Sequence, residues 1–333
     1  MPLAMAYGMT SLLTDLMDPP ATMPASAREL PHDLVAVGRF LLAEGYSFTT
    51  VTPTTHSRVL SRMGGRSATS LRDVFGWNLP FKAEVLPQRI LLRMLAGGLV
   101  VAQGGLFRST VRFASLDGRL YAHDAFPTLA PDAVFFGPDT YRFNTAVQTC
   151  LLPCDLLVDV CCGSGVGGLE ASLALAQRVV LADSNPKALD FAEANSFLAG
   201  ASRVVLHEAD LLAGLDERPD AIIANPPYLV DPLSRTYRDG SGVLGTGLAL
   251  RIVDQSIRLL APGGQLLLYT GSPIVDGTDR FAAAFLPLAR AAGCAVEYEE
   301  LDPDVFGEEL ENPIYATVDR IAAVVLSLTV PHR

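Results

Sequence analysis

The sequence has few cysteines, no excess of positive charge and no long uncharged apolar run. Its five cysteines among 333 residues are too few and too scattered for a disulfide framework or a zinc site, and a reducing cytoplasm is the simplest compartment for such a chain. No run of about 18 apolar residues is free of charge, so we expect no membrane-spanning segment and no membrane partner. The formal net charge of −11 disfavours a large nucleic-acid surface, because nucleic-acid affinity rests on neutralising phosphates with lysine and arginine.

The length allows two domains of roughly 100–200 residues each, and the sequence pattern changes near residues 131–150. Residues 1–24 contain Met and Pro but no Lys or Arg, unlike a secretory signal, and we expect them to form a flexible or partner-docking tail. We predict a smaller α+β domain over residues 25–130, which recognises the substrate, and an α/β domain over residues 131–333.

The first part reads as helices followed by β-hairpins, which is typical of a winged-helix-like module. Ser26 is a candidate cap for a helix that runs to about Glu44, and a second helix is predicted over Leu86–Leu95. The predicted strands are Phe48–Val51, Leu99–Ala102, Leu106–Ser115 and Leu120–His123. If Leu106–Ser115 is one strand, Arg108 and Arg112 share a face because of their even spacing, and we expect that face to be solvated.

The second part alternates apolar strands with helices, which predicts a Rossmann-like α/β fold with a parallel sheet covered on both faces. The predicted strands are Leu156–Val160, Arg178–Asp183, Arg203–Leu206, Ala221–Ala224 and Gln265–Thr270. The predicted helices are Gly168–Gln177, Pro186–Leu198, Gly247–Leu260 and Asp279–Ala292. Two last strands, near Val296–Leu301 and Ile321–Leu328, are expected to form an antiparallel edge.

A glycine-rich loop follows the first of these strands and opens a helix. Gly163, Gly165 and Gly168 let the backbone pass close to a ligand, and the helix start adds unpaired N–H groups. Asp159 ends the strand and can take a charged amino group. Asp183, about 20 residues after Gly163, is placed to accept hydrogen bonds from both ribose hydroxyls of a nucleotide cofactor. The spacing alone fits NAD or FAD as well as S-adenosylmethionine.

Asp210 helps to separate these cofactors. It follows the strand Arg203–Leu206 and can accept from the adenine amine of S-adenosylmethionine, although a turn cap explains Asp210 equally well when it is taken alone.

The tetrapeptide Asn225-Pro226-Pro227-Tyr228 follows the strand Ala221–Ala224, where the loop faces the ligand crevice of a parallel sheet. Two prolines remove two backbone donors and leave carbonyl acceptors. The Asn225 side-chain oxygen and the Pro226 carbonyl can therefore hold both hydrogens of an –NH₂ group, and Tyr228 can stack on a planar group. This arrangement frees the nitrogen lone pair for attack on a sulfonium methyl, and positioning supplies most of the catalysis.

With these residues in place, residues 132–330 resemble the HemK-like glutamine methyltransferase family of class I methyltransferases. Asp239-Gly240, Gly247-Leu248, Arg251 and the segment Phe136 to Thr140 are also similar to family motifs. The resemblance implies S-adenosylmethionine as cofactor and Asn225, Pro226, Pro227 and Tyr228 as the catalytic residues. It implies the following cofactor-binding residues: Asp159, Cys161, Gly163, Gly165, Asp183, Ser184, Asp210, Leu211 and Asn225. No metal is expected.

The chain departs from the family pattern at several places. Cys161 stands where the family has the first glycine of the loop, and Tyr141 replaces the usual acid after Pro-Asp-Thr. The segment Asp302–Tyr315 is longer and more acidic than the last hairpin of the family. These differences favour an amide or amine acceptor other than the release-factor glutamine, such as a small molecule, and the acceptor is expected to be either a protein glutamine or such a small molecule.

Three other functions compete with this hypothesis. The same tetrapeptide serves methylation of an exocyclic amine on a nucleic-acid base, which the negative charge of the chain disfavours. An NAD- or FAD-dependent oxidoreductase would leave Asn225–Tyr228 unexplained. A cofactor-binding protein that transfers no methyl group would not need Asn225 and Tyr228 intact.

Overall fold

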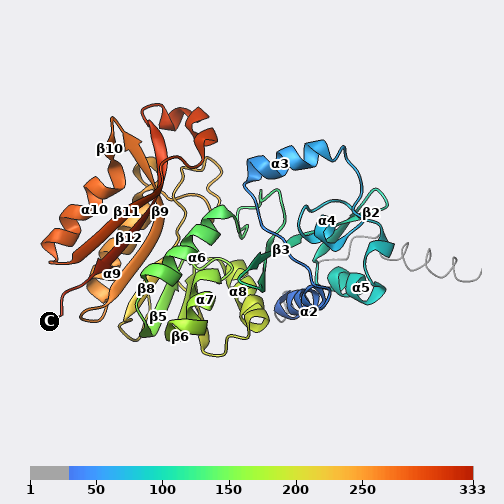
Figure 1. The fold of residues 1–333 in the computed structure, drawn as a ribbon, viewed down its shortest axis with the longest axis horizontal. Helices are drawn as coiled ribbons and strands as arrows, with labels where there is room; N and C mark the ends of the chain where they lie inside the picture. The colour runs from blue at the N-terminus through green and yellow to red at the C-terminus, as the bar shows by residue number, and fades with distance from the viewer. Residues whose placement is uncertain (1–29, 333) are drawn as a thin grey trace, which may run out of the picture.

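The structure is a computed structural model that describes residues 30–332, so the predicted tail and the Ser26 cap lie outside the described residues. Within that range an α+β part and a larger α/β part lie side by side, with α8 at their junction (Figure 1). This arrangement agrees with the predicted Rossmann-like fold and a smaller part before it. None of the described helices is long and apolar enough to cross a bilayer.

The large sheet has the strand order β11-β12-β9-β8-β5-β6-β7, and the two-residue β10 pairs with β9. Pairing is parallel between β5 and β6, β5 and β8, β6 and β7, and β8 and β9. The predicted antiparallel edge is confirmed, because β12 pairs antiparallel with both β9 and β11. The strands are β5 (Cys154–Val160), β6 (Ala176–Asp183), β7 (Val204–Glu208), β8 (Ala221–Ala224), β9 (Gln265–Val275), β10 (Thr278–Asp279), β11 (Ala295–Asp302) and β12 (Arg320–Thr329).

Helices cover both faces of this sheet, as the continuous apolar strands predict. They are α6 (Pro138–Cys150), α7 (Val166–Ala174), α8 (Pro186–Ala199), α9 (Gly247–Leu259) and α10 (Arg280–Ala291). Alternate strand residues enter different cores, since successive side chains point to opposite faces. Leu157 and Ile223 pack with α6 and α7, whereas Val158 and Ile222 pack with α9 and α10. The sequence analysis did not predict α6.

The N-terminal part has its own apolar core, which also includes Phe191 of α8. Its elements are α2 (Leu30–Ala43), α3 (Pro53–Arg62), α4 (Leu71–Phe75), η1 (Ala83–Val85), α5 (Gln88–Ala96), β1 (Val100–Gln103), β2 (Leu106–Ser109), β3 (Val111–Leu116) and β4 (Arg119–Asp124). The strands form two separate hairpins, β1–β2 and β3–β4. Helix α3 lies at the top of this part in Figure 1, away from α2 and α5.

Several predictions for this part were wrong. Residues 48–51 form no strand, although Phe48 exchanges hydrogen bonds with Ser115. The run predicted as one strand over residues 106–115 breaks at Thr110. Arg108 and Arg112 therefore lie on strands of different hairpins, and the even-spacing argument fails. Arg112 is buried rather than solvated, with 4% of its surface exposed.

Candidate active site

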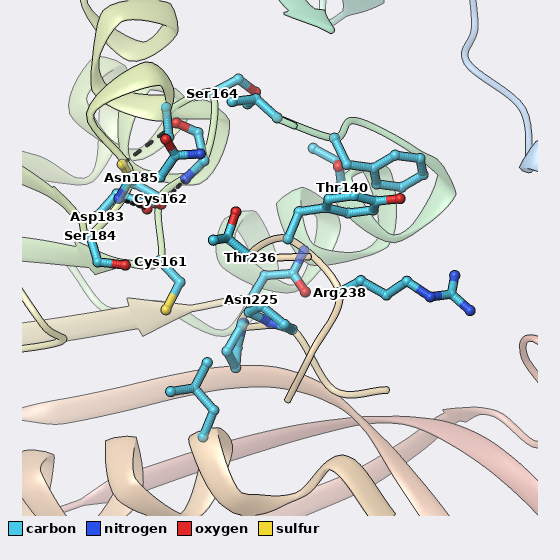
Figure 2. A pocket seen from close by; sticks show the side chains of 18 of the residues that line it. Thr140, Cys161, Cys162, Ser164, Asp183, Ser184, Asn185, Asn225, Thr236 and Arg238 are labelled. Atoms are coloured by element: carbon cyan, nitrogen blue, oxygen red, sulfur yellow. Dashed lines mark hydrogen bonds between the residues drawn. The ribbon is translucent and has the colours of Figure 1, made fainter. Parts of the chain in front are cut away.

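A cavity opens at the carboxyl ends of β5, β6 and β8, where a doubly wound sheet binds its ligands. Every predicted cofactor-binding and catalytic residue lines this cavity except Gly165. Figure 2 shows Asp183 and Cys161 on one side of it, with Asn225, Thr236 and Arg238 towards the other. The structure therefore brings together residues that are widely separated in the sequence.

The glycine-rich loop is held by two carboxylates. Asp159 is buried, and its Oδ2 accepts the Gly168 N–H at 2.8 Å. The Asp183 Oδ2 accepts the Gly163 N–H, and its Oδ1 accepts the Asn185 N–H, each at 2.9 Å. Burial raises the pKa of Asp159 to about 7 and also raises the pKa of Asp183. The backbone N–H groups of Gly163, Ser184 and Asn185 thus all point to this carboxylate.

The loop backbone explains why glycine occupies two of these positions. Gly163 and Gly165 have φ angles of 54° and 81°, and Cys161 has a φ of 56°. Cys161 thus occupies a left-handed position that disfavours most side chains, where the resembling family has glycine. Gly165 lies behind the loop, where an added Cβ would come within 3.1 Å of both Ala192 and Leu181. Its place is in the packing of the loop, at the N-cap of α7.

The residues after β7 form a more exposed part of the wall. Asp210 is exposed and pairs with Arg251 of α9 at 2.7 Å, so one of its oxygens is engaged. Leu211 is buried and has a φ of 56°. Ser184 is exposed beside Asp183. Asp210 caps no helix here, and its free oxygen is the acceptor that it offers to a ligand.

The tetrapeptide after β8 is held at its Tyr228 end. Asn225 is half-buried, and its carboxamide makes no hydrogen bond to any other residue within 30–332. Tyr228 is buried, and its hydroxyl donates to Asp139 Oδ2 at 2.6 Å. A Cβ on Gly271 would lie 2.3 Å from the Tyr228 ring, and a Cβ on Gly240 would lie 2.7 Å from the Tyr228 Cα. The tyrosine is thus held while the Asn225 amide stays available.

Asp139 is a residue that the analysis of the site missed, although it belongs to the Pro-Asp-Thr segment. It lies in the first turn of α6 and is mostly buried. Besides Tyr228 it accepts from the Tyr269 hydroxyl at 2.7 Å and from Arg142 at 3.1 Å. Burial and the nearby Asp139 carboxylate raise the pKa of Tyr228 well above its usual value, so this hydroxyl remains a donor. Asp139 was missed because its partners Tyr228 and Tyr269 are far from it in the sequence.

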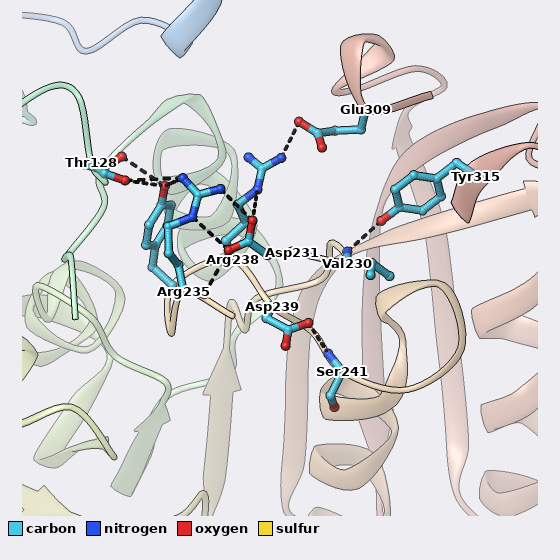
Figure 3. Close-up of polar contacts among 10 residues, drawn as sticks. Thr128, Val230, Asp231, Arg235, Arg238, Asp239, Ser241, Glu309 and Tyr315 are labelled. Carbon is cyan, nitrogen blue, oxygen red and sulfur yellow. Dashed lines mark hydrogen bonds and ion pairs between the residues drawn. The ribbon is translucent and has the colours of Figure 1, made fainter. Parts of the chain in front are cut away.

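The acidic segment Asp302–Tyr315 contributes Phe306 to the wall of the cavity. It contains η3 (Gly307–Glu311) and η4 (Pro313–Tyr315). The Phe306 ring lies edge-on to the Tyr228 ring, with 5.9 Å between the two ring centroids. In Figure 3, Arg235 and Arg238 converge on the buried Asp231, and Arg238 also pairs with Glu309. The Tyr315 hydroxyl accepts the Val230 N–H at 2.7 Å. These contacts tie the loop after the tetrapeptide to the C-terminal segment.

Several known proteins are similar to this chain. The profile of the Methyltransferase small domain family matches residues 149–274. A release factor glutamine methyltransferase from Moorella thermoacetica is 33% identical over 210 residues, which are 57% of this chain and 71% of that protein. A ribosomal RNA large subunit methyltransferase G from Alcanivorax borkumensis is 36% identical over 112 residues, or 33% of this chain and 26% of that protein. The solved structure of Trm5b from Pyrococcus abyssi has a TM-score of 0.49 and 18% identity, covering 70% of this chain and 62% of that one.

Three further release factor glutamine methyltransferases, from Borreliella burgdorferi, Rhodopirellula baltica and Deinococcus radiodurans, are matched over 48%, 49% and 55% of their length. The chain thus spans about half the length of those three relatives and 71% of the Moorella protein. The identity and coverage of the Moorella match decide the assignment: the chain belongs to the HemK-like family of class I S-adenosylmethionine-dependent N-methyltransferases.

Proposed function

We propose that this enzyme methylates the carboxamide nitrogen of a glutamine side chain. The observation that carries the proposal is the Asn225 carboxamide at the end of β8. It has no hydrogen-bond partner in the described part of the chain, and two prolines that donate no backbone N–H follow it. The names of several relatives, release factor glutamine methyltransferase, support a glutamine as the acceptor. Three aromatic side chains, Phe135, Tyr228 and Phe306, line the cavity and offer apolar surface to a planar amide.

The residues of the cavity fit S-adenosylmethionine. Gly163 has nothing within 4 Å of its Cβ position and lines the cavity, so the loop leaves room for a ligand beside it. We propose that Asp183 accepts the ribose hydroxyls, that Asp159 faces the amino group and that Asp210 faces the adenine. Cys161, Ser184 and Leu211 would line the remaining wall. When bound, S-adenosylmethionine supplies an electrophilic methyl group on a cationic sulfonium.

The chain's own groups would prepare the acceptor nitrogen. An amide nitrogen is a poor nucleophile because its lone pair is delocalised into the carbonyl. The Asn225 side-chain oxygen and the Pro226 carbonyl would accept its two hydrogens and favour a nitrogen whose lone pair points out of the amide plane. Tyr228, held by Asp139, would fix the plane of the amide. Such positioning converts binding energy into rate.

The acceptor is tested by offering three substrates with methyl-labelled S-adenosylmethionine: a glutamine-bearing peptide, free L-glutamine and a single-stranded RNA. We expect label in the peptide or in L-glutamine, and acid hydrolysis of that product should release labelled methylamine, which identifies an N-methyl amide. Replacing the glutamine of the peptide by glutamate serves as the matched control. Label in the RNA alone would replace the proposal by base methylation, for which the ribosomal RNA methyltransferase relative gives a precedent.

Cofactor affinity is expected to depend on pH through Asp159. Because burial raises its pKa to about 7, Asp159 must lose a proton before it can pair with an ammonium group. We predict that the affinity for S-adenosylmethionine rises about tenfold per pH unit as the pH approaches 7 from below, and then levels off. Calorimetric titration from pH 5.5 to 8 measures this, and the Asp159→Asn variant should give a flatter profile.

The same raised pKa fixes the sign of the effect on stability. The folded, cofactor-free protein holds the Asp159 proton more tightly than the unfolded chain does. The stability from this group is therefore complete below about pH 4 and is lost as the pH rises to about 7. A pH profile of cofactor affinity that is identical in wild type and Asp159→Asn would contradict the assigned role.

Asp139 is expected to act as a positioning residue. We predict that Asp139→Ala lowers kcat by about 10-fold or more, because the Tyr228 ring loses its anchor, and costs roughly 2–4 kcal/mol of stability, because two buried tyrosine hydroxyls lose their acceptor. Asp139→Asn, which keeps one acceptor oxygen, should restore part of the rate. Kinetics at saturating cofactor together with urea unfolding would measure both effects. A loss of stability with unchanged kcat would leave Asp139 a purely structural role.

A further inference from the structure

The N-terminal part buries a guanidinium that has no counter-charge among residues 30–332. Arg112 of β3 is 4% exposed, and its Nε and Nη2 atoms are buried without a hydrogen bond. No carboxylate among residues 30–332 pairs with it, and the titratable side chains that act on it are Tyr46 and Tyr141, whose hydroxyls are neutral because burial raises their pKa. Its Cζ atom lies 5.3 Å from the centroid of the Phe48 ring. A buried charge without a counter-charge is costly, so this guanidinium is suited to receive an anion.

Buried polar side chains of other segments lie near Arg112: His123 and His56 directly, and Thr50 through Tyr141, whose hydroxyl accepts the Thr50 N–H. His123 is its direct cross-strand partner on β4, so the two side chains are on the same face of the hairpin. His56 is near enough for the charge of Arg112 to lower its pKa further. Buried atoms without a hydrogen bond include Thr50 Oγ1, His56 Nδ1 and His123 Nε2. We call Thr50, His56, Arg112 and His123 the Arg112 cluster.

Both histidines of the cluster offer an acceptor. His56 Nε2 lies 3.1 Å from the Trp77 carbonyl, and His123 Nδ1 lies 3.0 Å from the Asp124 carbonyl. A carbonyl oxygen can only accept, so these ring nitrogens carry the protons. Burial lowers the pKa of His56 to about 4 and lowers that of His123 well below its usual value, which keeps both rings neutral. The remaining nitrogens, His56 Nδ1 and His123 Nε2, are therefore bare acceptors.

The Arg112 cluster thus combines one guanidinium cation with two neutral hydrogen-bond acceptors, the unprotonated imidazole nitrogens of His56 and His123. A carboxylate matches the planar guanidinium through two parallel hydrogen bonds. A simple anion such as acetate has no N–H donor, so it would leave His56 Nδ1 and His123 Nε2 without a hydrogen bond. A ligand that also carries N–H donors would satisfy both nitrogens. From this pairing we propose that the Arg112 cluster binds an α-amino acid, with its carboxylate on Arg112 and its ammonium group towards His56 and His123.

The cluster lies directly behind the wall of the catalytic cavity. Pro53 and Thr140 line that cavity, and Tyr141, beside Thr140, accepts the Thr50 N–H at 3.0 Å. Helix α3 carries His56 as its only buried residue, so few apolar contacts hold this helix over the cluster. The proposed amino acid would therefore reach the cluster by a local displacement of α3. The proposal is independent of which nitrogen the enzyme methylates.

The only tryptophan in the sequence reports on this site. The Trp77 ring centroid lies 5.1 Å from that of Phe48 and 5.3 Å from that of His56. The experiment is a titration of the full chain with glycine and with L-alanine, followed by Trp77 fluorescence and by calorimetry. Neither probe has a carboxamide, so the proposed amide acceptors at Asn225 do not recognise it. Glycine methyl ester, which lacks the carboxylate, and acetate, which lacks the ammonium group, are the matched ligands.

We expect saturable binding of glycine or L-alanine, and binding at least 10-fold weaker for glycine methyl ester and for acetate. Arg112→Met should weaken amino-acid binding at least 10-fold without lowering the thermal midpoint, because it removes an uncompensated buried charge. Arg89→Met makes the same chemical change on the exposed face of α5 and should bind as wild type does. The ligand series in wild type decides the question even if Arg112→Met does not fold. Absence of saturable binding, or equal affinity for the ester, would overturn the proposal.

Discussion

Replacing Asn225 with alanine is expected to lower kcat for methyl transfer by about 10²- to 10³-fold, the range found when one preorganised polar group of an active site is removed. The Asn225 carboxamide has no other hydrogen-bond partner among residues 30–332, so its removal leaves no protein contact unsatisfied. The loss should therefore appear in kcat and not in stability. Steady-state kinetics with the glutamine acceptor measure it.

Asn225 is also expected to border the cofactor, so its effect on the acceptor must be measured separately from its effect on cofactor binding. Rates are compared at saturating S-adenosylmethionine, where weaker cofactor binding no longer affects kcat. Asn225→Gln keeps the carboxamide but moves it by one methylene, and we expect a loss nearly as large as with alanine, since positioning is the proposed role. A kcat within about threefold of wild type for either variant would remove Asn225 from the catalytic residues.

The larger α/β part could be predicted well because its signals are local. Strands such as Ala221–Ala224 are short apolar runs, and Asn185-Pro186 marks the start of α8 in the sequence itself. The cavity residues followed from the same logic, because parallel strands end at one edge of a sheet. Asp159, Asp183 and Asn225 thus meet as expected.

The features that were not predicted from the sequence depend on contacts between distant segments. The Asp139 carboxylate meets Tyr228 and Tyr269 only after folding, over sequence separations of 89 and 130 residues. Arg112 resembles a surface residue of a strand, and only the packing of Phe48 and α3 around it makes it buried. The extended segment at Phe48 forms only two hydrogen bonds with Ser115, too few for a strand, although its apolar residues suggested one.

Replacing Asp183 with alanine is expected to weaken S-adenosylmethionine binding by about 10- to 100-fold, because a hydrogen bond to a charged group contributes about 1.5–3 kcal/mol. Calorimetric titration measures the change, with NADH as the control ligand. We expect NADH not to bind to either protein. Asp216→Ala, a change of an exposed aspartate on the same part of the chain, should leave the affinity unchanged.

The Asp183 carboxylate also holds the glycine-rich loop, so Asp183→Ala changes the loop as well as the cofactor contact. It accepts the N–H groups of Gly163 and Asn185, so Asp183→Ala is expected to lower the thermal midpoint as well. Asp183→Asn has nearly the same shape, but its amide NH₂ would face one of these two donors. If Asp183 serves only the loop, both variants should bind S-adenosylmethionine with the wild-type Kd and should reach the wild-type kcat once the cofactor is saturating. If it also binds the ribose, Kd rises in both variants even below their unfolding temperatures, and that outcome assigns the carboxylate to the cofactor.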